Sequence, residues 1–555
     1  MQTLPKTLDE TYERILVNID ELFREDVQKV LQFLAFSARA VSLEEVVEVL
    51  AVSFEGGPRF EPEQRYPEPR DILTRCSSLV SFWESRGINQ LRLAHFSVKE
   101  YLISARIQSG PARMYGVTFK DAHGFIARAC LAYLLQFKTP VDRDDSTNKD
   151  FPLVQYAAAY WMQHAQIHED TDLQILIMEF LQPSQNHYLN WRIFCTWERD
   201  VAPPLYYTAE AGMRETTRLL LEKGADINAH EGKNDNALQA AARGGHDAIV
   251  QLLLDRGADV NVQGGKHGNA LVAAVRGGYE AIVQLLLDKG ADINSEGGAF
   301  GNALVAAASG GNEAIVQLLL DKGAQGGKYE NVLLAAARYG HKAIVQLLLD
   351  KGTDVNSQGG KYGNVLQAAA RHGHGSIVQL LLDRGADINL EGGMFGSALV
   401  AAASGGHEAV VQLLLDKRAN VNAQGGTFGN ALVAAASGGY QSIIHLLLNN
   451  GANINAQGGK YGNALQAAAR FGQEAIVQLL LTKGADVNAQ GGRHGDALQA
   501  AAAYGHEAVV QLLLDKGAYV NAQGGRHGNA LQAAARGGYE AIVKLLLKDG
   551  KDVNA

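Results

Sequence analysis

The pattern of apolar and polar positions repeats along residues 204–555 with a nearly constant period of 33 residues. The repeated string is NALQAAARGGHDAIVQLLLDRGADVNVQGGKHG, at residues 236–268. The positions equivalent to Ala237 are Ala270, Ala303, Val332, Val365, Ala398, Ala431, Ala464, Ala497 and Ala530. Only the step from Ala303 to Val332 is shorter, at 29 residues, and a degenerate copy around Leu205 brings the total to eleven. Such self-similarity predicts an elongated repeat architecture.

Each copy predicts two helices, a turn and a hairpin-like loop. Asn236 precedes an alanine-rich run and is a preferred N-cap residue, as are its equivalents. The equivalents are Asn269, Asn302, Asn331, Asn364, Ser397, Asn430, Asn463, Asp496 and Asn529. Gly245 is expected to end this short helix in the left-handed conformation. The apolar run IVQLLL then forms a second helix, which is followed by GADVN and a glycine-rich turn. No copy can bury its apolar face alone, so neighbours must stack.

These repeats resemble the ankyrin family in their period, helix pair and GADVN segment. Most copies replace the family's T-P-L-H segment with N-A-L-Q, and only the degenerate copy keeps the proline, as Pro204. The resemblance implies an α-solenoid over residues 204–555. It also implies that the turn tips and first helices line a concave face that binds a protein partner.

Residues 1–110 lack the repeat and predict three helices followed by a hairpin. The helices are expected at about 8–19, 25–37 and 43–52, and the Thr7/Glu10 and Ser42/Glu45 pairs form the spacing of capping boxes. Residues 54–70 are expected to form an exposed loop, and residues 79–83 and 90–96 the hairpin, with His95 on it. Residues 111–203 predict a helical connector that caps the first repeat. The fold class is therefore mainly α: a small winged-helix-like domain, a helical connector and a solenoid.

Three strings give the N-terminal region a second resemblance. LPKTLDETYERIL (4–16), VSLEEVVEVLAV (41–52) and RLAHFSVKEYLIS (92–104) resemble the winged-helix segment of fungal STAND proteins, which are NLR-like. In that family a NACHT NTPase precedes the segment and ankyrin repeats follow it. The resemblance implies that the NTPase is missing here, in a truncated paralogue, a fragment or a mispredicted gene. The alternative function is the C-terminal portion of a signal-transducing NTPase.

Charge and composition narrow the class of function. The net charge is −9, and residues 1–106 carry 13 basic and 17 acidic residues, which disfavours nucleic-acid binding. Cys76, Cys130 and Cys195 form no CxxC pair and are expected to be buried thiols of a reducing compartment. The N-terminus has no apolar signal core and no apolar run is long enough to span a membrane. We expect a cytoplasmic or nuclear protein.

Catalytic, metal and cofactor motifs do not emerge from the sequence. The GlyGlyLys string at 264–266 lacks the spacing and the Ser/Thr of a phosphate loop, so we expect no ATP binding. The histidines after the helix-ending glycines, such as His246 and His341, occupy turn positions that also hold Tyr, Asn and Gln. No zinc spacing or nucleophile–base set can be placed. The sequence predicts a non-enzymatic protein without cofactors.

Variation between copies marks the candidate partner surface. One subtype combines Gln and Arg on the first helix with a Lys-Tyr tip, and the other combines Val and Ser with a Phe tip. The predicted partner-binding residues, all expected to be exposed, are Lys361, Tyr362, Phe395, Phe428, Lys460, Tyr461, Arg493 and His494. Recent duplication of blocks would also explain why these positions vary together. Two irregularities stand apart: Arg418 replaces a glycine, and the repeat after Ala324 lacks four residues.

Overall fold

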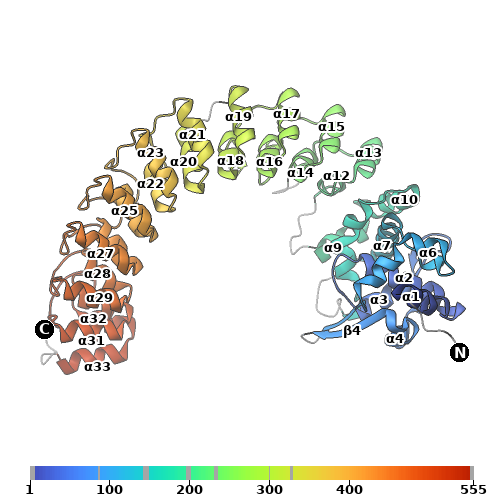
Figure 1. Ribbon diagram of the computed structural model, residues 1–555, viewed down its shortest axis with the longest axis horizontal. Helices are drawn as coiled ribbons and strands as arrows, with labels where there is room; N and C mark the ends of the chain where they lie inside the picture. Colours follow the sequence, from blue (N-terminus) through green and yellow to red (C-terminus); the bar gives the residue numbers. More distant parts are fainter. Residues whose placement is uncertain are drawn as a thin grey trace. The chain divides into compact units, whose positions relative to one another are not determined.

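The computed structural model describes residues 7–85, 88–141, 149–195, 202–229, 235–298, 301–324 and 329–549. The chain forms two compact units, one of residues 1–291 with 297–299 and one of residues 292–296 with 300–555. Helices make up most of both units, and the strands are few and short (Figure 1). The expected mainly helical class is confirmed.

The first unit begins with three helices, and side chains cap the starts of the first and the third as the sequence predicts, whereas no side chain caps the second. They are α1 (Leu8–Val17), α2 (Arg24–Phe36) and α3 (Leu43–Leu50). The Thr7 hydroxyl accepts a hydrogen bond from the Glu10 backbone amide at 3.2 Å. Ser42 and Glu45 form the complete capping box at the start of α3. These contacts satisfy amides that have no partner within the first turn.

A three-stranded sheet follows the helices. Its strands are β1 (Val41–Ser42), β4 (Val80–Ser85) and β5 (Ile88–Leu93), in the order β1-β5-β4, and both pairings are antiparallel. The expected hairpin is thus confirmed, but β5 ends at Leu93. His95 instead begins α5 (Phe96–Leu102), because its Nδ1 accepts from the Ser97 amide at 3.2 Å and so caps the helix.

The expected loop at 54–70 contains a little regular structure. β2 (Val52–Ser53) pairs with β3 (Arg59–Phe60), and a 3-10 turn, η2 (Pro62–Gln64), follows. The remaining short elements before the connector are η1 (Glu21–Phe23), α4 (Asp71–Arg75), η3 (Ser77–Leu79), α6 (Ala105–Ser109) and η4 (Arg113–Tyr115).

The connector packs against the first repeat within the same unit. Its helices are α7 (Phe119–Leu134), α9 (Val154–Ala165), α10 (Thr171–Phe180) and α11 (Asn186–Cys195). The Trp191 and Tyr207 rings meet edge-on with centroids 5.2 Å apart, and the Glu169 carboxylate accepts from the Thr216 hydroxyl at 2.6 Å. This contact agrees with the expected cap. Most of the expected exposed loop at 141–150 lies outside the described residues.

The repeats contribute a first and a second helix each. In the first unit they are α12 (Pro204–Glu210), α13 (Arg214–Glu222), α14 (Ala237–Gly244), α15 (Asp247–Asp255), α16 (Ala270–Gly277) and α17 (Glu280–Asp288). In the second unit they are α18 (Ala303–Gly310), α19 (Glu313–Asp321), α20 (Tyr329–Tyr339), α21 (Lys342–Asp350), α22 (Val365–Arg371), α23 (Gly375–Asp383), α24 (Ala398–Gly405), α25 (Glu408–Asp416), α26 (Ala431–Gly438), α27 (Gln441–Asn449), α28 (Ala464–Arg470), α29 (Glu474–Thr482), α30 (Ala497–Tyr504), α31 (Glu507–Asp515), α32 (Ala530–Gly537) and α33 (Glu540–Asp549).

The chemistry of one repeat explains this regularity. The Asn236 side chain accepts from the Gln239 amide at 2.8 Å, and Gly245 ends α14 with φ at 78°. The alanines of the first helix are buried, so neighbouring first helices approach closely. On the second helix α15 the buried residues are Ile249, Val250 and Leu253, fewer than the five apolar positions expected to form its face.

One expected N-cap is wrong. Asn331 lies inside α20, which starts at Tyr329 rather than at Val332. The four missing residues shorten the preceding arm, and the helix includes residues that form the tip in other repeats. Residues 325–328 of that arm lie outside the described residues.

Candidate interaction surface

The glycine-rich turns of the second unit form a continuous ladder of tips. We call the two residues after each GlyGly pair the tip. Each hairpin is closed by a glycine pair, such as Gly392 with Gly396, or by the short strands β6 (Gln358–Gly359) and β7 (Gly363–Asn364). The first residue of each tip donates its backbone amide to the carbonyl of the same position one repeat earlier. These bonds are Met394 to Lys361 (3.0 Å), Thr427 to Met394 (2.8 Å), Lys460 to Thr427 (3.1 Å), Arg493 to Lys460 (3.2 Å) and Arg526 to Arg493 (3.0 Å).

The second tip residues are rings that pack on one another. Tyr362 and Phe395 stack with centroids 6.1 Å apart, and Phe395 and Phe428 with centroids 6.4 Å apart. Tyr461 continues the row at 5.6 Å from Phe428. Two further repeats contribute His494 and His527, whose rings stack at 6.0 Å. The rings therefore join neighbouring hairpins to one another.

The structure separates the eight predicted partner-binding residues into two groups. Lys361, Lys460 and Arg493, at first tip positions, are exposed as expected. Tyr362, Phe395 and His494 are only 7%, 4% and 6% exposed, so the expectation that they are exposed is wrong. Phe428 and Tyr461 are half-buried. The physical reason is the stacking of rings between hairpins, which removes their faces from solvent.

The first-helix position that distinguishes the two subtypes is also buried. The Gln367 side chain donates to the carbonyls of Leu390 and Gly396 at 3.0 and 3.2 Å, and Gln466 makes the equivalent pair of bonds at 2.7 and 2.9 Å. Val400, from the other subtype, is 1% exposed. Gln therefore anchors the next hairpin from within, and this position does not face a partner.

Sequence reasoning missed three residues of the exposed row. Met394, Thr427 and Arg526 occupy the first tip position, as Lys361 does, and Met394 and Arg526 are exposed. The 33-residue spacing from Lys361 could have identified all three. We call these six first tip residues the exposed tip row, in which only Thr427 is half-buried: Lys361, Met394, Thr427, Lys460, Arg493 and Arg526.

Cations gather at the C-terminal end of this row. We define the basic tip cluster as Lys460, Arg493 and Arg526 with the first-helix residues Arg470 and Arg536. None of the five forms an ion pair with a carboxylate among residues 329–549. In contrast, Arg243 of the first unit, which occupies the position of Arg470 in its repeat, pairs with Glu210. The cluster therefore has uncompensated positive charge.

Arg470 is fixed in the middle of the cluster. Its guanidinium lies 5.2, 5.5 and 4.5 Å from the ring centroids of Tyr461, Phe471 and Tyr504. One guanidinium nitrogen lies 2.5 Å from His494 Nε2. Burial lowers the pKa of His494 to about 4, and the charges of Arg470, His527, Arg493 and Arg526 contribute further. The imidazole is therefore neutral at pH 7 and accepts a hydrogen bond from Arg470.

The described residues show neither a metal site nor a helix that could cross a membrane. They contain no group of three His, Cys, Asp or Glu side chains suited to a metal ion. Their helices are all too short or too polar to cross a bilayer. Cys76 and Cys130 are buried, whereas Cys195 is only half-buried because its thiol, 3.0 Å from the Ala158 carbonyl, lies at the end of α11.

Comparisons with known proteins agree with the repeat geometry. The family model for ankyrin repeats, in sets of three copies, matches overlapping segments that together span residues 205–555: 205–297, 271–359, 304–392, 333–425, 365–458, 398–491 and 465–555. The chain is also similar to the azaphilone pigments biosynthesis cluster protein L of Monascus ruber, with 37% identity over 279 residues. That match covers 45% of this chain and 59% of the relative, so the chain spans less than two-thirds of the relative's length. The family model matches more than half of the residues of this chain, and the chain therefore belongs to the ankyrin-repeat family.

Proposed function

We propose that the chain recognises a protein partner along the exposed tip row, and that it acts by binding rather than by catalysis. The observation that supports this most strongly is the hydrogen-bonded ladder, which holds the backbones of six successive first tip residues in one line. A rigid row costs little conformational entropy when a partner binds. The first tip position varies between repeats, whereas the rings and glutamines behind it, which also vary, hold the hairpins together.

We propose further that the chain is the sensor or scaffold part of an NLR-like signalling protein, and that it recognises its partner in this role. The support is the order of elements: three helices, an antiparallel hairpin and a helical connector precede the repeats. This order fits the winged-helix segment that the three N-terminal strings resemble. The Monascus ruber relative is named an azaphilone pigments biosynthesis cluster protein, and this name identifies no partner.

Site-specific photo-crosslinking tests the proposed surface. A photoreactive residue at position 460, in the tip row, is compared with one at position 483, at the end of α29. Both lysines are exposed, so either replacement leaves the packing intact. The proposal predicts that a partner from cell extract crosslinks at 460 and not at 483. Equal crosslinking at both positions, or crosslinking at 483 alone, would contradict it.

A further inference from the structure

The C-terminal tips carry a charge pattern that the earlier tips of the ladder lack. First tip residues are cationic in three consecutive repeats, at Lys460, Arg493 and Arg526, whereas Met394 and Thr427 precede them. Two of the three arms leading into this region lack an aspartate, and the third keeps it as Asp486. Asn453 and Tyr519 replace the aspartate found at Asp354 and Asp387 in earlier repeats. The positive charge is therefore concentrated in the last three tips.

The carboxylates nearest to these tips in the sequence do not neutralise them. Asp496 is 3% exposed and caps α30, accepting hydrogen bonds from Gln490 and from the Gln499 amide at 3.0 and 2.7 Å. Asp486 lies in an exposed arm, where its carboxylate accepts from the Asn488 amide at 2.9 Å. Among the residues described between 329 and 549, neither forms an ion pair with the cluster. The cations of the cluster are therefore available to pair with carboxylates of another molecule.

We propose that the basic tip cluster binds an extended acidic segment of the partner protein. The inference rests on the proposed function and specifies the chemistry of the partner. Tips joined by backbone hydrogen bonds of 3.2 and 3.0 Å lie about 5 Å apart, the separation of paired strands. Side chains on one side of an extended peptide recur about every 7 Å. Flexible Lys and Arg side chains bridge this difference, so carboxylates at alternate positions can each reach a tip cation.

The geometry favours a peptide over single-stranded nucleic acid. Proteins that bind single strands without sequence preference stack bases on available aromatic faces. Here the tip rings beside the cations pack on neighbouring tip rings, as His494 does on His527 and Tyr461 on Phe428. Phe471 and Tyr504 are 41% and 40% exposed, but the Arg470 guanidinium already lies over both rings. Carboxylates need only the cations, and arginine binds them through two parallel hydrogen bonds.

Fluorescence anisotropy with a labelled oligoglutamate peptide and the full chain tests the inference. We expect saturable binding that weakens with added salt. Binding should weaken at least tenfold in the triple variant Lys460→Ala, Arg493→Ala, Arg526→Ala. The matched control removes three exposed lysines at the ends of second helices, Lys417→Ala, Lys483→Ala and Lys516→Ala, and should change the affinity less than twofold. An oligoglutamine peptide of the same length should not bind.

A second readout locates the peptide. A bound carboxylate favours protonated imidazole, so the pKa of His494, about 4 in the free chain, should rise when the peptide saturates the chain. The inference is overturned if oligoglutamate does not bind, or if the control variant weakens binding as much as the tip variant. It is also overturned if oligouridylate binds more tightly through the same three residues. Partner crosslinking at position 460 without oligoglutamate binding would refute the acidic segment and leave the proposed function standing.

Discussion

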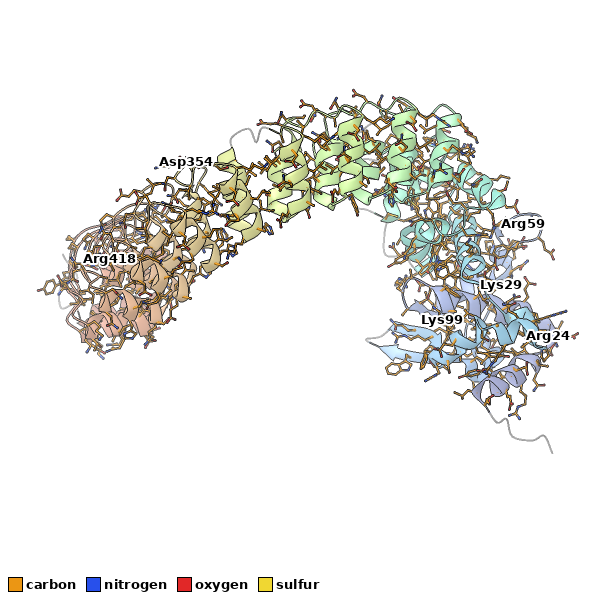
Figure 2. All side chains as sticks on the ribbon, turned by 45° about the horizontal axis from the view of Figure 1, so that its top comes forward. Arg24, Lys29, Arg59, Lys99, Asp354 and Arg418 are labelled. Atoms are coloured by element: carbon orange, nitrogen blue, oxygen red, sulfur yellow. The ribbon has the colours of Figure 1, made fainter. Side chains whose placement is uncertain are left out.

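Arg418, which is labelled in Figure 2, has a positive φ of 68°. Among the described residues it is the only one other than glycine with such a backbone. The equivalent positions hold glycine, as Gly385 and Gly451 with φ of 86° show. Nothing lies within 4 Å of a Cβ built at either glycine, so the site has room for a side chain. The strain at Arg418 is therefore in its own backbone, as the sequence comparison between copies predicts.

Replacing this residue should stabilise the second unit. Arg418→Gly relieves about 1 kcal/mol of left-handed strain, partly offset by the greater freedom of glycine in the unfolded chain. Urea unfolding followed by far-ultraviolet circular dichroism should show a higher midpoint. Gly385→Arg is the reverse control and should lower it by a similar amount. An unchanged or lower midpoint for Arg418→Gly would contradict the assigned strain.

A buried histidine pair joins α7 to α9 in the first unit. The Nδ1 atoms of His123 and His164 lie 2.7 Å apart, and His164 Nε2 lies 2.9 Å from the Tyr156 hydroxyl. That hydroxyl accepts from the Ala38 amide at 2.9 Å, so its proton is directed to His164. Burial, with a smaller contribution from the charge of His123, lowers the pKa of His164 to about 4. Both rings are therefore neutral at pH 7.

This pair should make the first unit sensitive to acid. The unfolded chain binds a proton at His164 with an ordinary pKa near 6.5, but the folded chain resists protonation until about pH 4. Stability therefore falls by about 3 kcal/mol as pH drops through this window. All four tryptophans precede residue 203, so their fluorescence during urea unfolding reports this unit. His164→Gln should flatten the pH profile, and an equally steep profile would exclude His164 as the cause.

Individual elements show how far the repeat pattern predicts structure. The pattern locates helix starts and ends because caps and glycines depend on neighbours within a few residues, as at Asn236 and Gly245. The pattern wrongly places the side chains of Tyr362 and Gln367 on an exposed partner surface. Their burial depends on rings and carbonyls of the next repeat, which no local pattern encodes. The extension of α20 to Tyr329 was missed for a similar reason, since the effect of a deletion depends on which neighbour the shortened arm can reach.

Substitutions at two glycines of similar conformation distinguish the stability cost of separating stacked hairpins from the cost of backbone strain. Gly396 and Gly385 have φ of 84° and 86°, but only a Cβ on Gly396 would meet a neighbouring hairpin, 2.5 Å from the Gly425 carbonyl carbon. We expect Gly385→Ala to cost about 1 kcal/mol from backbone conformation alone. Gly396→Ala should cost about 2 kcal/mol more because the hairpins must separate. Equal urea midpoints for the two variants would show that the ladder tolerates separation.

The repeat with the deletion should form the weakest joint of the second unit. Its arm lacks the Asp-Val/Ile-Asn-x segment, in which Asn356, for example, accepts from the Asp387 amide of the next repeat at 2.7 Å. Stability in a repeat array depends on such neighbour contacts. Hydrogen exchange should therefore be faster for residues 318–324 and 329–340 than for 450–475. Equal protection of these segments would show that the longer α20 compensates for the lost arm.

At the scale of the whole chain, the net charge does not reveal where positive charge is concentrated. The net charge of −9 describes the average surface, whereas the basic tip cluster is a local departure from it at one end of the array. The two compact units also divide inside the repeats, near residue 292, so the boundaries expected at 110 and 203 stay predictions. The family can be identified from the sequence because every copy contains the same pattern of caps, glycines and apolar positions. The partner is not, because its contacts involve side chains brought into line only by stacking.

The most direct test of the account measures the affinity of a crosslinked and identified partner for three forms of the full chain. The tip variant Lys361→Ala, Lys460→Ala, Arg493→Ala should weaken binding by about 1–3 kcal/mol, as loss of interface anchors does. The control variant Lys417→Ala, Lys483→Ala, Lys516→Ala, which loses the same charge from the ends of second helices, should bind as the unmodified chain does. Equal affinity of the tip variant and the unmodified chain would contradict recognition through the tip row.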